Sequence, residues 1–160
     1  MNLNPSHNWG HNIAFGEEYY QNAVQLLRNI RDDAGILAEI AAKATDALRG
    51  GHTVYANVTT GHMPTHELAN DREGNPAFFE FTGADSCTPG QFAAMRAGDV
   101  LLTNNVSEPV RAARDAGIYV VVFTTCYVNN RNAPQGKVNP NVHDWMPEDV
   151  ASRVIDSHIP

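Results

Sequence analysis

Hydrophobic residues recur at every third or fourth position over residues 17–48, which is the period of an α-helix with one buried stripe. The stretch RDDAG at residues 31–35 can kink this helix or divide it in two. Gly50 and Gly51 predict its end, because tandem glycines favour a left-handed C-cap and destabilise a helix interior. The stripe comprises Tyr20, Val24, Leu27, Ile30, Ile36, Leu37, Ile40, Ala41, Ala44 and Leu48.

Short apolar and β-branched runs then alternate with turn and helix patterns. They predict strands at HTVYANV (52–58), PAFFEF (76–81), DVLLTN (99–104) and IYVVVFTT (118–125), with a last strand around Val154. The intervening patterns predict a helix that begins near Pro64, a short helix over TPGQFAAMRAG (88–98) and another over SEPVRAARDAG (107–117). In the last of these, Ser107 suits the N-cap and Gly117 the stop.

Strands of nearly continuous hydrophobicity suit a sheet that is covered on both faces. Their alternation with helices predicts an α/β protein, a three-layer α/β/α sandwich around a central, mostly parallel five-stranded sheet. Right-handed crossovers place the carboxyl ends of all strands on one rim, where open α/β sheets bind ligands. We expect a single domain over residues 1–160, with an irregular N-terminal arm over 1–16 and a long loop over 127–146 that is rich in Asn, Pro and Gly.

Composition narrows the classes of function. The chain has 160 residues, of which 42 % are hydrophobic and 18 % charged, so it can bury a core. Its net charge of −7 and the absence of a Lys/Arg cluster argue against nucleic-acid binding. No apolar run is long enough to cross a membrane and no leader pattern is present, so we expect a cytoplasmic protein with no membrane partner. Cys87 and Cys126 lack the spacing of a zinc site and are expected to be free thiols.

Two strand-to-helix turns, NVTTGHMPTHEL (57–68) and LLTNNVSEPV (101–110), follow one plan. Each places hydroxyl or amide side chains before a helix N-terminus, which offers unpaired N–H groups and a positive dipole end. Together they predict a cradle for an anion, most plausibly a phosphate. The alternative is that these side chains only cap helices. The donors are Thr59, Thr60, Thr103, Asn104, Asn105 and Ser107.

Acid–base groups follow the first of these turns. Glu67 suits a base that moves a proton between neighbouring carbons, and His62 can polarise or protonate a sugar oxygen. Alternatively, Glu67 only complements the helix dipole. His62 and His66 stand four residues apart, as metal ligands on a helix do, so a divalent metal such as zinc is a further alternative. Pro64 lies between them and a third ligand is lacking, so we expect no cofactor.

These residues resemble the sugar isomerase (SIS) domain of phosphosugar isomerases and phosphosugar-binding proteins. The resemblance rests on the long N-terminal helix, GGHTVYANVTTGHMPTHEL, RAGDVLLTNNVSEPVRAARDAGIYVVVFTT and the final RVIDSHIP, and it covers about residues 17–160. It implies a five-stranded parallel sheet of the SIS type, which is flavodoxin-like, and a homodimer or homotetramer with a sugar-phosphate site shared between subunits.

By this resemblance Thr60, Gly61 and His62 form the first sugar-phosphate loop, and Glu67 matches the family's glutamate. The second, phosphate-gripping loop corresponds to Thr103, Asn104, Asn105 and Ser107. His158 approaches the site from the C-terminal side. Isomerising members shuttle a proton between C1 and C2 through an enediol. We therefore expect a phosphosugar-binding protein that interconverts an aldose and a ketose phosphate.

One departure supports another reading. The second loop of the family usually reads Ser-x-Ser-Gly, whereas TNNVSEP lacks the glycine and one serine. The alternative is therefore a non-catalytic phosphosugar-sensing or regulatory SIS module, or a subunit that needs a partner chain.

Overall fold

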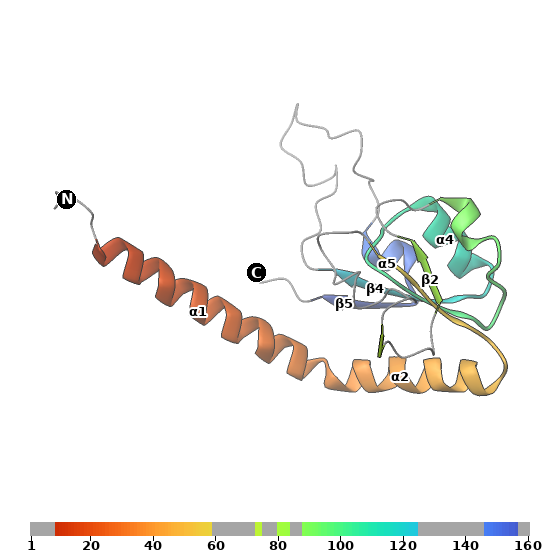
Figure 1. Cartoon of the computed structure of the whole chain (residues 1–160), viewed down its shortest axis with the longest axis horizontal. Coiled ribbons are helices and arrows are strands. Elements are labelled where there is room, and N and C mark those ends of the chain that lie inside the picture. Colours follow the sequence, from red (N-terminus) through yellow and green to blue (C-terminus); the bar gives the residue numbers. More distant parts are fainter. Residues whose placement is uncertain (1–8, 59–72, 75–79, 84–87, 125–145, 157–160) are drawn as a thin grey trace, which may run out of the picture.

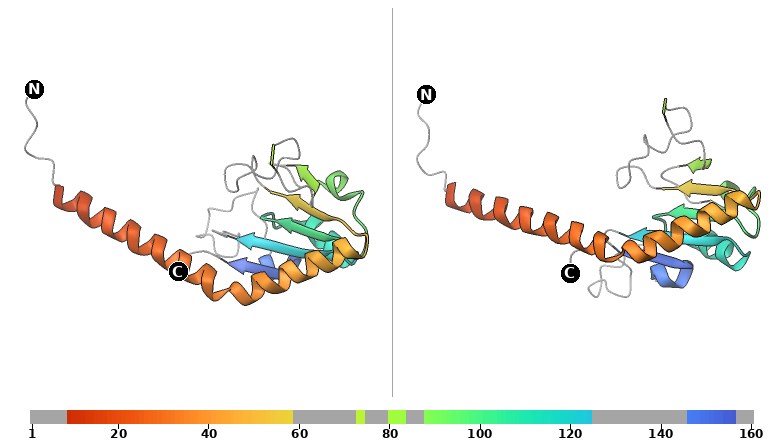
Figure 2. Two further views of the ribbon diagram at one scale, coloured as in Figure 1. Left: turned by 60° about the horizontal axis from the view of Figure 1, so that its bottom comes forward. Right: turned by 90° about the horizontal axis from the view of Figure 1, so that it is seen from below.

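The computed structural model describes residues 9–58, 73–74, 80–83, 88–124 and 146–156, and it combines a long helical arm with an α/β body (Figure 1). The arm is α1 (Trp9–Asp32), and α2 (Ala34–Arg49) continues it along the body. The two helices divide at Asp33, within the stretch where a kink or a split was expected. Backbone bonds from Asp33 N to Asn29 O and from Leu37 N to Asp33 O, each 3.0 Å, link the two segments, which meet at a bend (Figure 2).

The N-terminal boundary of this arm corrects a prediction. Residues 9–16 were expected to belong to an irregular arm, but α1 is helical from Trp9. Gly16 lies inside the helix, and a Cβ added there would meet nothing within 4 Å. The C-terminal boundary is as predicted, because α2 ends at Gly50 and Gly51 turns with φ of 76°.

All the described strands are parallel, and helices flank their sheet, so the predicted α/β class is confirmed. The strands are β1 (Val54–Asn57), β2 (Glu80–Gly83), β3 (Val100–Thr103), β4 (Tyr119–Thr124) and β5 (Arg153–Asp156), in the spatial order β2-β1-β3-β4-β5 (Figure 2). Four of them, β1, β3, β4 and β5, pair in unbroken register. The short edge strand β2 joins β1 with a register shift between Ala56 and Asn57.

Two predicted elements differ from the structure. The second strand was predicted over residues 76–81; residues 76–79 lie outside the described residues, and the described strand β2 runs to Gly83, two residues beyond the predicted end. The helix expected over residues 88–98 is limited to a 3₁₀ turn, η1 (Pro89–Phe92). It does not continue because the buried carboxylate of Asp99 accepts a bond of 2.8 Å from Arg96 N, which holds the chain in a turn before β3.

Apolar side chains fill both faces of the sheet. On one face, Ile40 and Ala47 of α2 pack against the sheet residues Val54, Val100 and Val121. The other face is covered by η1, α4 (Glu108–Asp115) and α5 (Pro147–Val150). Each fully buried Val or Leu stabilises the fold by roughly 1.5–3 kcal/mol. This second core comprises Tyr55, Leu101, Val110, Ala113, Ile118, Val120, Val122 and Val150.

Polar groups fasten the amino ends of the strands. Asp99, which is 1 % exposed, accepts a bond of 3.0 Å from Thr53 N in addition to the one from Arg96 N. At the other side of the sheet, Arg153 at the start of β5 donates two bonds of 3.0 and 2.9 Å to Glu39 of α2. The hydroxyl of Tyr119 donates to the same carboxylate at 3.3 Å. These bonds tie α2 and the loops to the sheet at the edge opposite the carboxyl ends.

None of the helices in the described ranges has the length and apolar character needed to cross a membrane.

Candidate functional site

The strand order identifies one place in the sheet where a ligand would bind. From β1 the chain moves outward to β2 on one side, and then returns to place β3, β4 and β5 in turn on the other side. The order therefore reverses between β1 and β3. Ligands of open parallel sheets bind outside the carboxyl ends of the strands at such a reversal. The two turns selected from the sequence leave the sheet at this point, because they follow β1 and β3.

Pairing aligns the ends of these two strands. Asn57, the last residue of β1, is opposite Thr103, the last residue of β3. Both side chains are fully buried, with 0 % exposure. Buried amides and hydroxyls need hydrogen-bond partners, because an unpaired one costs about 1–3 kcal/mol. The bonds of these residues therefore define the local architecture.

A chain of hydrogen bonds crosses the edge from β3 to β2. Asn105 Nδ2 donates to Asn57 Oδ1 at 2.8 Å, and Asn57 Nδ2 donates to Thr82 Oγ1 at 3.3 Å. The Thr82 hydroxyl in turn donates to the carbonyl of Ala56 at 3.3 Å. We call Asn57, Thr82, Thr103 and Asn105 the edge network. It holds the β3–α4 turn directly against the end of β1.

The β3–α4 turn is shaped by its own side chains. Asn105 N donates to Thr103 Oγ1 at 3.0 Å, which bends the chain sharply after the strand. Ser107 occupies the N-cap position of α4 with extended backbone angles, as predicted, and is 8 % exposed. No side-chain capping bond to α4 is formed within the described part of the chain. The simple capping role is therefore not what Ser107 performs here.

An acidic and a basic side chain lie together at the start of α4. Glu108 lies in the first turn of the helix, where a carboxylate is favoured by the dipole. Arg111 Nη2 donates to its carboxylate at 3.2 Å, and this bond with the Glu108 charge raises the pKa of the Arg111 guanidinium above its ordinary value. The helix terminus thus offers backbone N–H groups to an anion, but an acidic side chain stands close to them.

An apolar hollow of about 280 Å³ lies next to this corner, between η1 and α4. Its lining includes Phe92, Met95, Pro109 and Ile118, with Glu108 as the charged member. Such a lining does not match a phosphorylated sugar, which needs several polar partners. We therefore place the candidate site at the edge network and not in this hollow.

The structure brings four of the sequence-predicted residues together. Thr103, Asn104, Asn105 and Ser107 form the β3–α4 corner. The first loop and the acid–base residues lie outside the described residues, and so do both cysteines; these are Thr59, Thr60, Gly61, His62, His66, Glu67, Cys87, Cys126 and His158. Their assigned roles stay predictions. Among the described residues, no three His, Cys, Asp or Glu side chains gather as metal ligands would.

Two members of the edge network were not selected from the sequence. Asn57 could have been found from its position, because a polar residue that ends a buried strand at the sheet rim is a common site residue. Thr82 could not, because the predicted second strand ended at Phe81, one residue before it. Comparison of the chain with protein-family models and with curated proteins gave no match.

Proposed function

We propose that this chain is an SIS-type domain that binds a phosphorylated sugar at the carboxyl ends of β1 and β3 and interconverts its aldose and ketose forms. The observation that carries the proposal is the 2.8 Å bond between Asn105 and Asn57. It joins the two turns selected from the sequence at the reversal of strand order. Donors from both turns can therefore serve one ligand.

A phosphate suits this corner because its charge is met by neutral donors and by a helix terminus. The N-terminus of α4 presents main-chain N–H groups next to Asn104, Asn105 and Ser107. Such a terminus carries about half a positive charge, which favours a bound anion. The buried edge network fixes the direction of Asn105, so little side-chain entropy is lost when a ligand binds.

In this proposal, residues of the turn that follows β1 and of the C-terminal segment carry out the isomerisation. Glu67 removes the proton from C2 of the aldose, which forms an enediol, and returns it to C1 to give the ketose. His62 assists opening of the sugar ring, and His158 completes the site from the C-terminal side. The carboxylate is regenerated at the end of the cycle, so no oxidant or cofactor is consumed.

A second candidate is a phosphosugar-binding module without turnover, or a subunit that acts with a partner chain. Glu108 favours this alternative, because its carboxylate in the first turn of α4 weakens the grip on a phosphate dianion. A sensor can work with modest affinity, whereas a catalyst benefits from tight binding of the phosphate in the transition state.

Binding and turnover are tested separately on the full chain. Aldose and ketose phosphates of five and six carbons are titrated by calorimetry, and interconversion is followed by NMR. Glu67→Gln should bind but not isomerise. Asn105→Asp keeps the side-chain shape but adds a negative charge, so affinity should fall about tenfold or more. Asn22→Asp adds the same charge at an exposed position of α1 and should bind like the wild type.

The outcomes separate the candidates. Binding without interconversion in the wild type selects the non-catalytic module. A wild type that binds no sugar phosphate, or an Asn105→Asp variant with unchanged affinity, overturns the proposed site.

A further inference from the structure

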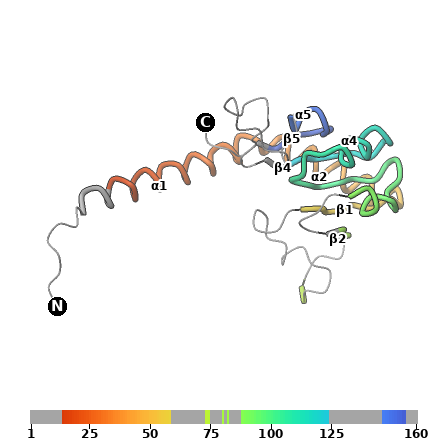
Figure 3. Tube along the Cα trace, turned by 90° about the horizontal axis from the view of Figure 1, so that it is seen from above, coloured from red at the N-terminus to blue at the C-terminus, as the bar shows by residue number. Residues whose placement is uncertain are grey.

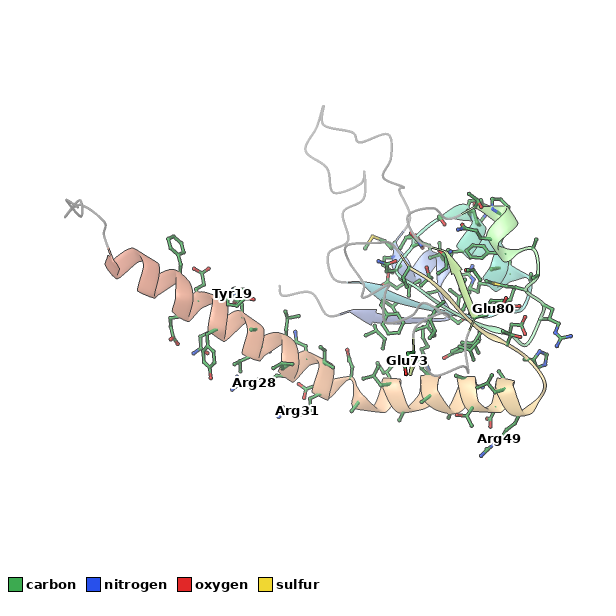
Figure 4. The ribbon with its side chains drawn as sticks, viewed as in Figure 1. Tyr19, Arg28, Arg31, Arg49, Glu73 and Glu80 are labelled. Carbon is green, nitrogen blue, oxygen red and sulfur yellow. The ribbon has the colours of Figure 1, made fainter. Side chains whose placement is uncertain are left out.

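Helix α1 carries an apolar surface that the described part of the chain does not cover. Phe15, Tyr19, Tyr20, Leu27 and Ile30 are 66, 78, 59, 67 and 41 % exposed. Successive members are four, one, seven and three residues apart, and at about 100° per residue all five lie on one half of the helix surface. We call these five residues the α1 stripe. Figures 3 and 4 show α1 extending away from the sheet, with Tyr19 far from the body.

An isolated helix of this kind needs a partner. Helix α1 has 24 residues, so it extends about 36 Å. Most helices in proteins are stable because an amphipathic face packs against something, and their intrinsic propensity contributes less. Two tyrosines, a phenylalanine and two aliphatic side chains are also more apolar surface than a helix normally leaves in water.

The charges beside the stripe are self-complementary. Glu17 precedes Tyr20 by three residues and Arg31 follows Leu27 by four, so both border the stripe. They are fourteen residues apart, about four turns at about 3.6 residues per turn, and therefore lie on the same side of α1. Val24 is the midpoint between them. An antiparallel copy of α1 centred on Val24 would place each glutamate beside the other helix's arginine.

We propose that α1 pairs antiparallel with α1 of a second copy of this chain, around a two-fold axis near Val24. The interface is isologous, so each contact occurs twice. The α1 stripes of the two copies cover each other, and Glu17 of each copy pairs with the partner's Arg31. Within one chain, the only ion pair of Arg31 among the described residues is with the neighbouring Asp32 at 3.2 Å, and both side chains are more than two-thirds exposed. Because an exposed ion pair contributes little free energy, Arg31 can leave Asp32 for Glu17 of a second copy at little cost.

A membrane surface is a poorer occupant of the stripe. Helices that lie on membranes carry many Lys and Arg residues on their polar face, which attract anionic lipids. On α1 the acidic residues Glu17, Glu18 and Asp32 outnumber the two basic ones, Arg28 and Arg31. The balance of charge disfavours lipid and fits a second copy, where opposite charges meet.

A first experiment tests the stripe. Sedimentation equilibrium of the full wild-type chain should give a dimer at micromolar concentration. Leu27→Glu puts a charge into the interface twice, so dimerisation should weaken at least about tenfold. Gln25→Glu adds the same charge on the polar face and should leave the dimer unchanged. Circular dichroism checks that each variant keeps its helices. A monomeric wild type, or equal effects of the two substitutions, overturns the proposal.

A second experiment tests the antiparallel register. Glu17→Arg places two arginine pairs in its own dimer, and Arg31→Glu places two glutamate pairs in its own, so each variant should dimerise several-fold more weakly than the wild type. Mixed together, they should form a heterodimer in which both pairs are again opposite in charge. If the mixture dimerises no better than the separate variants, the helices do not pair in this way, and another protein or a parallel arrangement covers the stripe.

Discussion

Gly98 lies in a conformation and a space that no other residue fits. Its φ is 94°, and a Cβ atom would stand 2.5 Å from Cε1 of His52. Its N–H donates to the carbonyl of Gly117 at 3.1 Å, so the backbone cannot move away without losing this bond. Gly51 also has positive φ, at 76°, but an added Cβ would meet nothing within 4 Å.

The two glycines separate backbone strain from steric conflict. Gly51→Ala should lose about 1–2 kcal/mol of unfolding free energy, the cost of a left-handed alanine. Gly98→Ala adds a clash with the His52 ring and should lose about 3 kcal/mol or more. Urea unfolding measures both. Replacing His52 by alanine in the Gly98→Ala background should recover part of the loss, and no recovery would show that the ring gives way freely.

At the level of single residues, the sequence predicted side chains but not their bonds. Thr103, Asn104, Asn105 and Ser107 were selected because they follow a strand and precede a helix. That Asn105 bonds Asn57 depends on β1 and β3 being neighbours, a long-range pairing that local patterns do not contain. The N-cap position of Ser107 was predicted correctly, but its side chain makes no capping bond to α4 among the described residues. Residue preferences for the N-cap predict the position of a residue in the helix and not the bond that its side chain makes.

In the proposed site, the charge in the first turn of α4 sets the affinity of the β3–α4 corner for a phosphate. Removing the Glu108 charge should strengthen binding of a sugar phosphate about twofold to fivefold, because the repulsion between this carboxylate and the phosphate ends. Calorimetry of Glu108→Gln at low ionic strength measures this, and added salt should shrink the difference.

Glu148→Gln is the matched control, because Glu148 occupies the first turn of α5 and has no ion-pair partner among the described residues. It should leave the affinity unchanged. If Glu108→Gln also leaves it unchanged, the phosphate is not bound at the N-terminus of α4.

Among the elements, strands with strong local patterns were predicted well. Runs such as VYAN, VLLT and YVVVFT are mainly apolar, rich in valine and largely buried, so their position in the chain was recoverable. Element boundaries that depend on contacts with other parts of the fold were not predicted well. Pairing of Asn57 with Gly83 carries β2 past its predicted end, and it acts across more than twenty residues. The bonds of Asp99 stop η1, and they act through a buried charge. The start of α1 was missed because Gly16 interrupts the apolar pattern.

The whole molecule has an acid-sensitive connection between α2 and the sheet. The hydrogen bond from Arg153 is the main cause that lowers the pKa of Glu39 below its ordinary value of 4.5. A carboxyl whose pKa is lower in the folded state stabilises the fold above its unfolded value and loses that contribution as the pH falls. Glu39→Gln should therefore lower stability near neutral pH and flatten the decline below about pH 4.5.

Urea unfolding over a series of pH values tests this connection. Glu148→Gln again serves as the control and should keep the shape of the wild-type curve. A Glu39→Gln curve parallel to that of the wild type would mean that Glu39 and Arg153 do not pair in solution.

The polar ties of Asp99, Glu39 and Arg153 all lie at the amino ends of the strands, while the edge network lies at the carboxyl ends. The bonds that hold α2 and the loops to the sheet are therefore separated from the proposed ligand site by the length of a strand. The turns after β1 and β3 can accept insertions or grafted segments from other proteins without the loss of these bonds. Changes at the proposed site, in evolution or by loop engineering, therefore need no extra stability elsewhere in this small scaffold.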